Sequence, residues 1–309
     1  MPKKKTTIQD IANSLGFSRV TVSKALRNSA DVSEKTKEIV LNRAKLMGYK
    51  TFQSDPLPDA FPSESAASIN KSIALFLHMI PDSFHMASYF MMSLEQALGK
   101  IGYSLSLHLI TDYELSNQLL PASFHIQNTD AILALEIFNR NYCEFLCTLG
   151  KPILFSDIYS TFTQGDLSAD ILVADNYTAS VKLYSSVIED CKPKSIGFLG
   201  DPNYSLSFQD RFKGFLSVTQ KYGFSDSYKN HSIISNIQNF QNDIWMQNKF
   251  KTLEIPNLLV CANDILAMKA LTCLERLNIK VPDEVMVCGY DGTPAISSLY
   301  PALTTIIAP

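Results

Sequence analysis

The chain has 309 residues, of which 46% are hydrophobic and 18% charged, so it is long enough for more than one packed domain. The formal net charge of −3 hides an asymmetry. Residues 1–50 hold eleven of the 27 Lys/Arg and four of the 30 Asp/Glu, a charge of +7 that leaves −10 for the remainder. A basic module on an acidic body suits a polyanionic partner for the module alone, because the acidic body discourages unspecific coating of DNA.

Cysteine usage and the N-terminus bear on the compartment. The six cysteines lie inside apolar runs without a C-x-x-C motif, which favours buried, reduced thiols and a cytoplasmic protein. The Lys-rich N-terminus has no apolar segment of a secretory signal, and no run of eighteen apolar residues predicts a membrane span. We therefore expect no membrane partner.

Two short amphipathic helices are predicted on either side of Gly16-Phe17-Ser18. Gly16 favours the left-handed conformation that ends a helix, and Ser18 can cap the next one. A third helix is expected from about Ser33, its cap, to Met47. Two helices joined by a three-residue turn describe a helix-turn-helix motif. The apolar faces are formed by Ile8, Ile11, Ala12 and Leu15, then by Val22, Ala25 and Leu26, and then by Ile39, Val40, Ala44 and Met47.

The outer face of the second helix carries cations, hydroxyls and one short apolar group. These groups suit guanine edges, phosphates and a thymine methyl, although a solvated basic surface helix would show the same helical pattern. We predict that Arg19, Val20 and Lys24 contact bases. Phosphates are expected at Ser18, Thr21, Ser23 and Ser33, and Arg27 could serve either role.

The first fifty residues resemble the headpiece of the LacI family of bacterial transcription regulators. That headpiece has a helix, a Gly-x-Ser turn and a second helix reading T-V-S-R/K. The resemblance implies a homodimer that binds a pseudo-palindromic double-stranded DNA operator. The matching segments are Ile8-Gln9-Asp10-Ile11-Ala12, Gly16-Phe17-Ser18, Thr21-Val22-Ser23-Lys24, Val32-Ser33 and Gly48-Tyr49.

Residues 51–70 are predicted to be a linker, because they contain three prolines and little hydrophobic periodicity. In the LacI family this zone normally forms a hinge helix whose leucine enters the minor groove. Here Pro58 falls at the leucine position, and proline breaks so short a helix. We therefore predict no stable hinge helix, with Leu57 as the nearby candidate for a wedge.

From residue 71 onward strands are predicted to alternate with helices, the pattern of a doubly wound parallel α/β fold. The whole chain is then an all-α helix-turn-helix headpiece (1–50) followed by an α/β body (71–309) with two parallel-sheet lobes. Lobe one is expected at about 71–175 and 305–309, and lobe two at about 176–304. Strands are expected at 72–78, 104–109, 131–135, 152–155, 195–199, 231–234, 257–261 and 284–288, with 171–174 as a further candidate. Helices are expected at 91–101, 142–149, 179–188, 208–222, 240–250 and 265–277.

Polar residues follow several of the predicted strands, where ligands of open α/β sheets bind. Carboxylates accept hydroxyl protons and arginine donates in a rigid fork, so such a set would suit a polyol. Each aspartate alone could equally cap the next helix. The residues are Pro81-Asp82, Asp157, Asp175-Asn176, Asn263-Asp264 and Asp291, with Arg211 early in a predicted helix.

The body also resembles the LacI-family effector domain, which is similar to periplasmic sugar-binding proteins, dimerises, and couples ligand closure to DNA affinity. By position, the resemblance implies effector contacts at Asp157, Arg211, Asp264 and Asp291. The resemblance also implies an effector contact at Asp175, and it places Phe240 near the position of an aromatic residue that stacks on the effector. The segments that carry it are Ile80-Pro81-Asp82, Gly102-Tyr103-Ser104-Leu105, Asp130-Ala131-Ile132-Leu133, Val173-x-Asp175-Asn176, Arg211-x-x-Gly214-Phe215, Ala262-Asn263-Asp264, 289–294 and 303–306.

Two departures from the family pattern change the expectation. Ser83-Phe84-His85-Met86 replaces an Asn-Pro-Phe-Phe element, so Phe84 or His85 could line the cleft or belong to a plain loop. Family members usually continue beyond the position of Pro309 with a helix on lobe one and a strand on lobe two. Exposed apolar surface is therefore expected on lobe one.

The leading hypothesis is a ligand-responsive transcription regulator, a repressor whose effector is a sugar. The alternatives are a truncated or degenerate regulator with impaired dimerisation, a sugar-binding module without regulatory output, a transport protein and an enzyme. The five histidines fall in no metal or nucleophile motif, and neither G-x-S-x-G nor a Gly-rich phosphate loop occurs. No catalytic residue, metal or cofactor is therefore predicted. The basic headpiece argues against transport.

Overall fold

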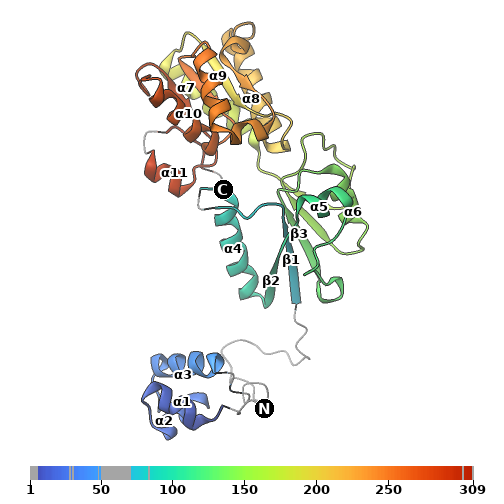
Figure 1. Ribbon diagram of the computed structural model, residues 1–309, viewed down its shortest axis with the longest axis vertical. Coiled ribbons are helices and arrows are strands. Elements are labelled where there is room, and N and C mark those ends of the chain that lie inside the picture. The colour runs from blue at the N-terminus through green and yellow to red at the C-terminus, as the bar shows by residue number, and fades with distance from the viewer. Residues whose placement is uncertain are drawn as a thin grey trace. The chain divides into compact units, whose positions relative to one another are not determined.

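The structure is a computed structural model that describes residues 6–27, 29, 31–47, 49, 71–82, 84–300 and 303–307. The chain divides into two compact units, residues 1–69 and 70–309, and each is described by itself (Figure 1). The prediction that residues 51–70 form no hinge helix, with Leu57 as a wedge candidate, falls outside the described residues. None of the described helices is long and apolar enough to cross a membrane.

The headpiece contains the three predicted helices. Thr7 caps the first helix and shares a capping box with Asp10, and Gly16 ends it at φ 68°. The Ser18 side chain accepts a hydrogen bond from the Thr21 amide at 3.0 Å and so caps the second helix. The helices are α1 (Ile8–Leu15), α2 (Arg19–Leu26) and α3 (Glu34–Leu46).

A small apolar core holds these helices together. One predicted core residue is wrong: the Ile39 side chain is 41% exposed, while Val40 beside it is fully buried. The aliphatic stem of Lys37 is buried instead, and its Nζ bonds Glu34 at 2.7 Å. The buried members are Ile11, Ala12, Val22, Ala25, Val32, Val40 and Ala44.

Lobe one is built on a five-stranded parallel sheet, which we name sheet A, with strand order β2-β1-β3-β4-β5. α4 covers one face of the sheet, and α5 and α6 cover the other (Figure 1). The strands are β1 (Lys71–Leu77), β2 (Tyr103–Leu109), β3 (Ala131–Leu135), β4 (Ile153–Ser156) and β5 (Asp170–Leu172). The helices are α4 (Met86–Lys100), α5 (Asp112–Asn117) and α6 (Arg140–Cys147).

Lobe two is built on a four-stranded parallel sheet, sheet B, with strand order β7-β6-β8-β9. Residues 303–307 run alongside the end of β9 through parallel bridges at Cys288–Thr304 and Asp291–Ile307. The strands are β6 (Ile196–Gly200), β7 (Ile233–Ile234), β8 (Leu258–Cys261) and β9 (Met286–Cys288). The helices are α7 (Asn176–Cys191), α8 (Leu206–Tyr222), α9 (Asp243–Thr252), α10 (Asp264–Arg276) and α11 (Pro294–Leu299), with 3₁₀ turns at Tyr228–His231 and Ile237–Gln241; a further 3₁₀ turn, Ile126–Asn128, precedes β3 in lobe one.

The α/β body follows the predicted alternation, with differences at element ends. α4 begins at Met86, five residues before the predicted start, because the His85 ring accepts a hydrogen bond from the Ala87 amide at 3.2 Å and caps it. The predicted helix 240–250 is a 3₁₀ turn followed by α9, since Asn242 caps a new helix there. The helices α5 and α11 were not predicted, because both are only six residues long.

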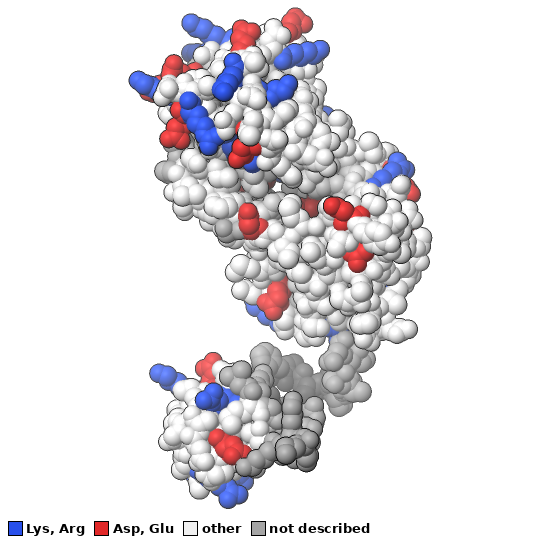
Figure 2. Space-filling model, viewed as in Figure 1, with Lys and Arg blue, Asp and Glu red and all other residues white. Residues whose placement is uncertain are grey.

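The α4 face of sheet A is largely apolar, with Ser156 and Asp170 on its β4–β5 side, and it is only partly covered. Register pairs align leucines of β1, β2, β3 and β4 on this face, and Leu172 of β5 joins them through its pairing with Ser156. The central leucines 75, 77, 133 and 135 are buried, whereas Leu107, Leu109 and Leu172 at the edges are 41–50% exposed. The predicted exposure of apolar surface on lobe one is therefore present. Figure 2 shows most charged side chains of the body over lobe two in this view.

Candidate functional site

The outer face of α2 presents the residues predicted to contact DNA. Val20 is 64% exposed, and Arg19 and Arg27 are also exposed. Lys24 Nζ forms an ion pair with Asp31 at 2.7 Å, and this pair lowers the pKa of Asp31. A base contact by Lys24 therefore has to compete with an acidic neighbour in the same headpiece.

The hydroxyl groups predicted to contact phosphates have local partners. Ser18 and Thr21 share a hydrogen bond at 2.8 Å, and Ser33 does the same with Thr36. Ser23 accepts a hydrogen bond from the Arg27 guanidinium at 3.0 Å. The bonds of Ser18 and Ser33 fix side chains at helix starts, where backbone amides also suit an anion, whereas Ser23 lies within α2.

In the body, a cavity of about 350 Å³ opens between the carboxyl ends of strands from both sheets. Its size falls in the range of small-molecule sites. Lobe one contributes Glu136 and Asp157, which follow β3 and β4 directly, together with His85 at the start of α4. Lobe two contributes Arg211 from α8 and Asp291 from the turn after β9.

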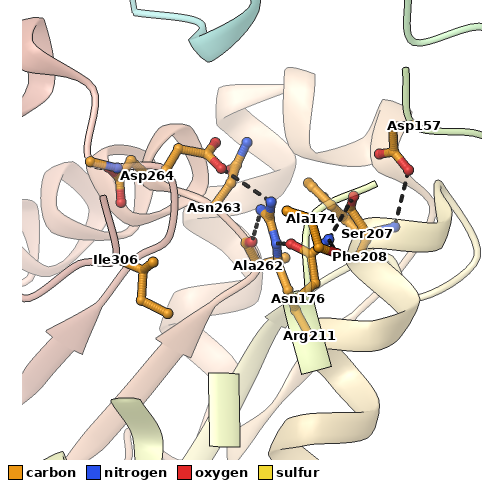
Figure 3. A network of polar contacts seen from close by, with 12 residues as sticks. Asp157, Ala174, Asn176, Ser207, Phe208, Arg211, Ala262, Asn263, Asp264 and Ile306 are labelled. Atoms are coloured by element: carbon orange, nitrogen blue, oxygen red, sulfur yellow. Dashed lines mark hydrogen bonds and ion pairs between the residues drawn. The ribbon is translucent and has the colours of Figure 1, made fainter. Parts of the chain in front are cut away.

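The Arg211 guanidinium, which lines this cavity, is held by a network of polar contacts (Figure 3). Its Nε donates to Asn176 Oδ1 at 3.0 Å, its Nη1 donates to the Ala262 carbonyl at 2.8 Å, and its Nη2 pairs with Asp291 at 3.2 Å. The Tyr290 ring lies 3.7 Å from the guanidinium carbon, at a cation–π distance. Because three of its donors are used within the protein, Arg211 is preorganised and its charge is matched by Asp291.

Asp157 links the two lobes. Its Oδ1 accepts hydrogen bonds from the Ile158 amide at 2.9 Å and from the Ser207 amide, in the first turn of α8, at 3.2 Å. A second bond across the lobes joins the Leu206 amide to the Ile158 carbonyl at 2.8 Å. A carboxylate at the N-terminus of a helix is favoured by the helix dipole.

Glu136 is a lining residue that the sequence analysis did not single out. The Glu136 amide donates to the Ser156 carbonyl at 3.0 Å, so Glu136 and Asp157 lie side by side at the ends of neighbouring strands. Glu136, Asp157 and Asp291 all have positive φ values, 56°, 57° and 117°. Positive φ values are uncommon for residues other than glycine, although aspartate adopts them more readily than most, and they are concentrated at functional sites.

The electrostatics of the cavity follow from its carboxylates. Burial raises the pKa of Glu136 to about 8, and the charges of Asp157 and Asp291 act in the same direction. Burial also raises the pKa of Asp291 to about 6, although Arg211 opposes the shift. The pKa of Asp157 is raised by burial, and that of His85 is lowered by burial. At neutral pH the cavity therefore holds a proton on Glu136 and a neutral His85.

Three of the six residues predicted to contact an effector line the cavity, namely Asp157, Arg211 and Asp291; the other three do not. Asp175 is exposed and caps α7 by accepting from the Thr178 amide at 3.0 Å. Asp264 is buried, and its carboxylate bonds the Gly292 amide and the Thr305 hydroxyl. Phe240 is 2% exposed and belongs to the lobe-two core, with Trp245 against its ring.

The aromatic side chains of the cavity come from positions that the sequence analysis left unassigned. Phe138, after β3, and Tyr204, after β6, meet across the lobes with ring centroids 4.6 Å apart. Of the two candidates in the segment after Pro81-Asp82, His85 lines the wall, with Met86 beside it, and Phe84 is not among the lining residues. The only sequence signal for these residues was their place just after a strand. The remaining aromatic lining residues are Phe90, Phe208 and Tyr290.

Two families match parts of the chain. Residues 7–51 match "Bacterial regulatory proteins, lacI family", and residues 192–309 match the "Periplasmic binding protein-like domain". The ribose operon repressor of Bacillus subtilis (strain 168) is 28% identical, over 98% of this chain and 86% of that protein.

Solved structures are similar over nearly the whole chain. A complex of the transcriptional regulator CelR with cellobiose has a TM-score of 0.62 at 17% identity, covering 97% of this chain and 87% of that one. A lac repressor dimer bound to operator and the anti-inducer ONPF has a TM-score of 0.59 at 18% identity, covering 98% and 87%. The predicted fold, a helix-turn-helix unit followed by an α/β body with parallel sheets, is confirmed.

Proposed function

Because this chain belongs to the LacI family of DNA-binding transcription regulators, we propose that it is a repressor controlled by a sugar bound in the body cavity. It acts in the cytoplasm as a homodimer on a pseudo-palindromic operator. The name of the ribose operon repressor and the operator complex of the lac repressor dimer support this proposal. Two headpieces related by a two-fold axis suit two operator half-sites.

The headpiece supplies the DNA contacts of this proposal. Arg19, Val20 and Lys24 on the outer face of α2 enter the major groove and contact bases. Phosphates are bound by side chains around α2 and at the start of α3, and these contacts set the position of α2 on the DNA. The residues are Ser18, Thr21, Ser23, Arg27 and Ser33. Phosphate contacts orient the protein, while base contacts select the sequence.

The observation that carries the effector proposal is the preorganised Arg211 guanidinium, paired with Asp291, in a cavity that Asp157 and several aromatic rings also line. Carboxylates accept hydroxyl protons, arginine donates, and aromatic faces pack on the apolar face of a sugar. Each such charge-assisted hydrogen bond contributes about 1.5–3 kcal/mol. The cellobiose in the CelR complex is consistent with this class of ligand.

Regulation requires that the ligand favour one arrangement of the lobes over another. The cavity is lined from both lobes, and Asp157 already bonds across them to the start of α8. A sugar that contacts Asp157 and Asp291 together therefore stabilises a particular lobe arrangement. In a dimer, that arrangement biases how the two headpieces engage the operator.

The test combines calorimetry and operator retardation on the full-length protein and on Asp291→Ala. A panel of monosaccharides, disaccharides and nucleobases identifies the ligand class. We expect a sugar to bind and to change operator affinity, and we expect Asp291→Ala to lose that response while retaining operator binding. Binding of a purine alone, or unchanged sugar affinity in Asp291→Ala, contradicts the proposal.

Light scattering at rising protein concentration separates this proposal from a regulator with impaired dimerisation. The exposed leucines of sheet A are the observation that keeps that alternative open. A sugar-binding module without regulatory output would bind the sugar with no change in operator retardation.

A further inference from the structure

The charges that line the effector cavity do not balance. Arg211 is the one Lys or Arg among the lining residues, and its guanidinium is paired with Asp291 at 3.2 Å. Glu136 and Asp157 remain without a cationic partner of their own. Because Glu136 is protonated at neutral pH, the unpaired negative charge rests on Asp157 until Glu136 loses its proton, and this charge disfavours an anionic sugar.

The Glu136 carboxylate has unused hydrogen-bonding capacity. Among the described residues, no hydrogen bond to this carboxylate occurs, and the only Lys, Arg or His nitrogen within 4.0 Å is His85 Nε2, at 3.5 Å. About a third of the Glu136 side chain is exposed, and Glu136 lines both this cavity and a smaller neighbouring one of about 240 Å³. Its acceptor oxygens are therefore available to a ligand.

The position of Glu136 beside Asp157 defines the geometry of a ligand group. The two residues directly follow the register pair Leu135 and Ser156 on strands β3 and β4. Neighbouring strands lie about 4.8 Å apart, a spacing that one ammonium group can bridge with its three N–H donors. Phe138 and Tyr204 also line the cavity, and aromatic rings attract cations.

A metal ion is a poorer occupant than an organic cation. Among the residues that the structure describes, no group of three His, Cys, Asp or Glu side chains is placed to hold a metal. About half of the residues that line the cavity are aromatic or aliphatic, so they can pack against the carbon atoms of an organic ligand. These features favour an ammonium group attached to a molecule that fills the remaining cavity.

We propose that the effector is a polyhydroxylated amine, such as an amino sugar, whose ammonium group lies between Glu136 and Asp157. Its hydroxyl groups bind Asp291 and the Arg211 network. This inference rests on the proposed function, because it names the chemical class of the effector for the same cavity. Glu136 is then the residue that distinguishes an amino sugar from its neutral counterpart.

Binding of such a ligand has a proton signature. Burial raises the pKa of Glu136 to about 8, so the carboxyl is protonated at neutral pH before the ligand binds. A nearby ammonium favours the carboxylate, so binding releases up to one proton. The titratable and charged groups that face Glu136 are His85, Asp157, Tyr204, Arg211 and Asp291.

The test is calorimetry with matched ligand pairs at about pH 6.5, below the pKa of Glu136. The probes are glucosamine, N-acetylglucosamine and glucose, and the corresponding galactose series. We expect an amine to bind up to about tenfold more tightly than its neutral partners, because loss of the Glu136 proton at this pH offsets part of the charge-assisted hydrogen bond gained. Titration in two buffers of different ionisation enthalpy should show proton release for the amine only.

Glu136→Gln keeps the shape of the side chain but removes its charge. We expect this variant to lose the preference for the amine and the proton release, while still binding neutral sugars. Glu275→Gln, a matched change at an exposed site on α10, should behave as the wild type.

The outcomes separate the two proposals. Neutral sugars that bind as tightly as their amines overturn the amine inference and leave the sugar proposal standing. Tighter amine binding that persists in Glu136→Gln places the ammonium elsewhere and also overturns the inference. Binding of nucleobases alone overturns both.

Discussion

The headpiece surface and the effector cavity differ in how their residues are brought together. The predicted DNA contacts lie between Ser18 and Ser33, project from α2 and the helix starts, and have partners a few residues away. The cavity residues lie between His85 and Asp291, come from both lobes, and surround a buried guanidinium. Substitutions in the headpiece should therefore change DNA binding with little effect on folding, whereas those in the cavity should change both ligand binding and stability.

The largest effect is expected from Arg211→Ala. This change leaves the Asp291 carboxylate, only 15% exposed, without its ion pair, and it removes a cation–π contact with Tyr290. Breaking a buried pair from one side typically costs about 3–5 kcal/mol of unfolding free energy. Urea denaturation measures it. Arg211→Lys keeps the charge but loses the planar guanidinium, so its unfolding free energy should lie between those of the wild type and Arg211→Ala. A loss of unfolding free energy below about 1 kcal/mol in Arg211→Ala would show that this network does not stabilise the fold.

The corresponding substitution in the headpiece is Lys24→Ala. We expect a loss of about 1–3 kcal/mol in operator binding and a relaxed preference at one base pair, with no change in unfolding free energy. Retardation on specific and random DNA measures both quantities. Equal weakening on the two DNAs would identify Lys24 as a phosphate contact instead.

Glu136→Gln should stabilise the protein in a pH-dependent way. Since the folded pKa of about 8 lies above the ordinary value of 4.5, the folded state keeps a proton that the unfolded state loses, so stability falls as pH rises from about 4.5 to 8. Glu136→Gln has no carboxyl at this position, so its unfolding free energy does not fall with pH for this reason. Because a third of the side chain is exposed, we expect a gain of about 1–2 kcal/mol at pH 8 and none at pH 4. Thermal denaturation across this range measures it, and an equal gain at both pH values would contradict the assignment.

The smallest effect is expected from Asp31→Asn. Asp31 pairs with Lys24 on the exposed headpiece surface and competes with DNA for it. Removing the acidic charge should strengthen operator binding about two- to fivefold at low salt, and less at high salt, because exposed pairs are weak and screened. Retardation as a function of salt provides the measurement. Unchanged affinity at low salt would mean that Lys24 does not approach the DNA.

Much of the fold could be predicted because local sequence determines it. Gly16 and Ser18 set the helix-turn-helix by backbone conformation and capping, and near-continuous apolar runs such as 72–77 indicate buried parallel strands. Ile39 was wrongly assigned to the buried face of α3. Helical periodicity places Ile39 and Val40 near the same edge of that face, and only Val40 is buried in the packed headpiece.

The candidate site was only partly predictable, since its geometry arises from packing between distant segments. Glu136 follows β3 in an apolar run and has no local feature that distinguishes it from a solvated residue. Asp175 took the capping role that any aspartate before a helix can adopt. Phe240 was expected to stack on a ligand, but the 3₁₀ turn that contains it directs the ring into the lobe-two core.

The packing around Asp264 restricts which substitutions at positions 264 and 289 can occur during evolution, because each residue limits the other. A methyl group at Gly289 would lie 2.0 Å from Asp264 Oδ1, and the same carboxylate bonds the Gly292 amide at 2.8 Å and the Thr305 hydroxyl at 2.7 Å. No side chain at position 289 is tolerable while Asp264 is present, and shortening Asp264 first leaves two hydrogen-bond donors without their acceptor. Both single steps are costly, so descendants of this chain are expected to keep the two residues together across long divergence.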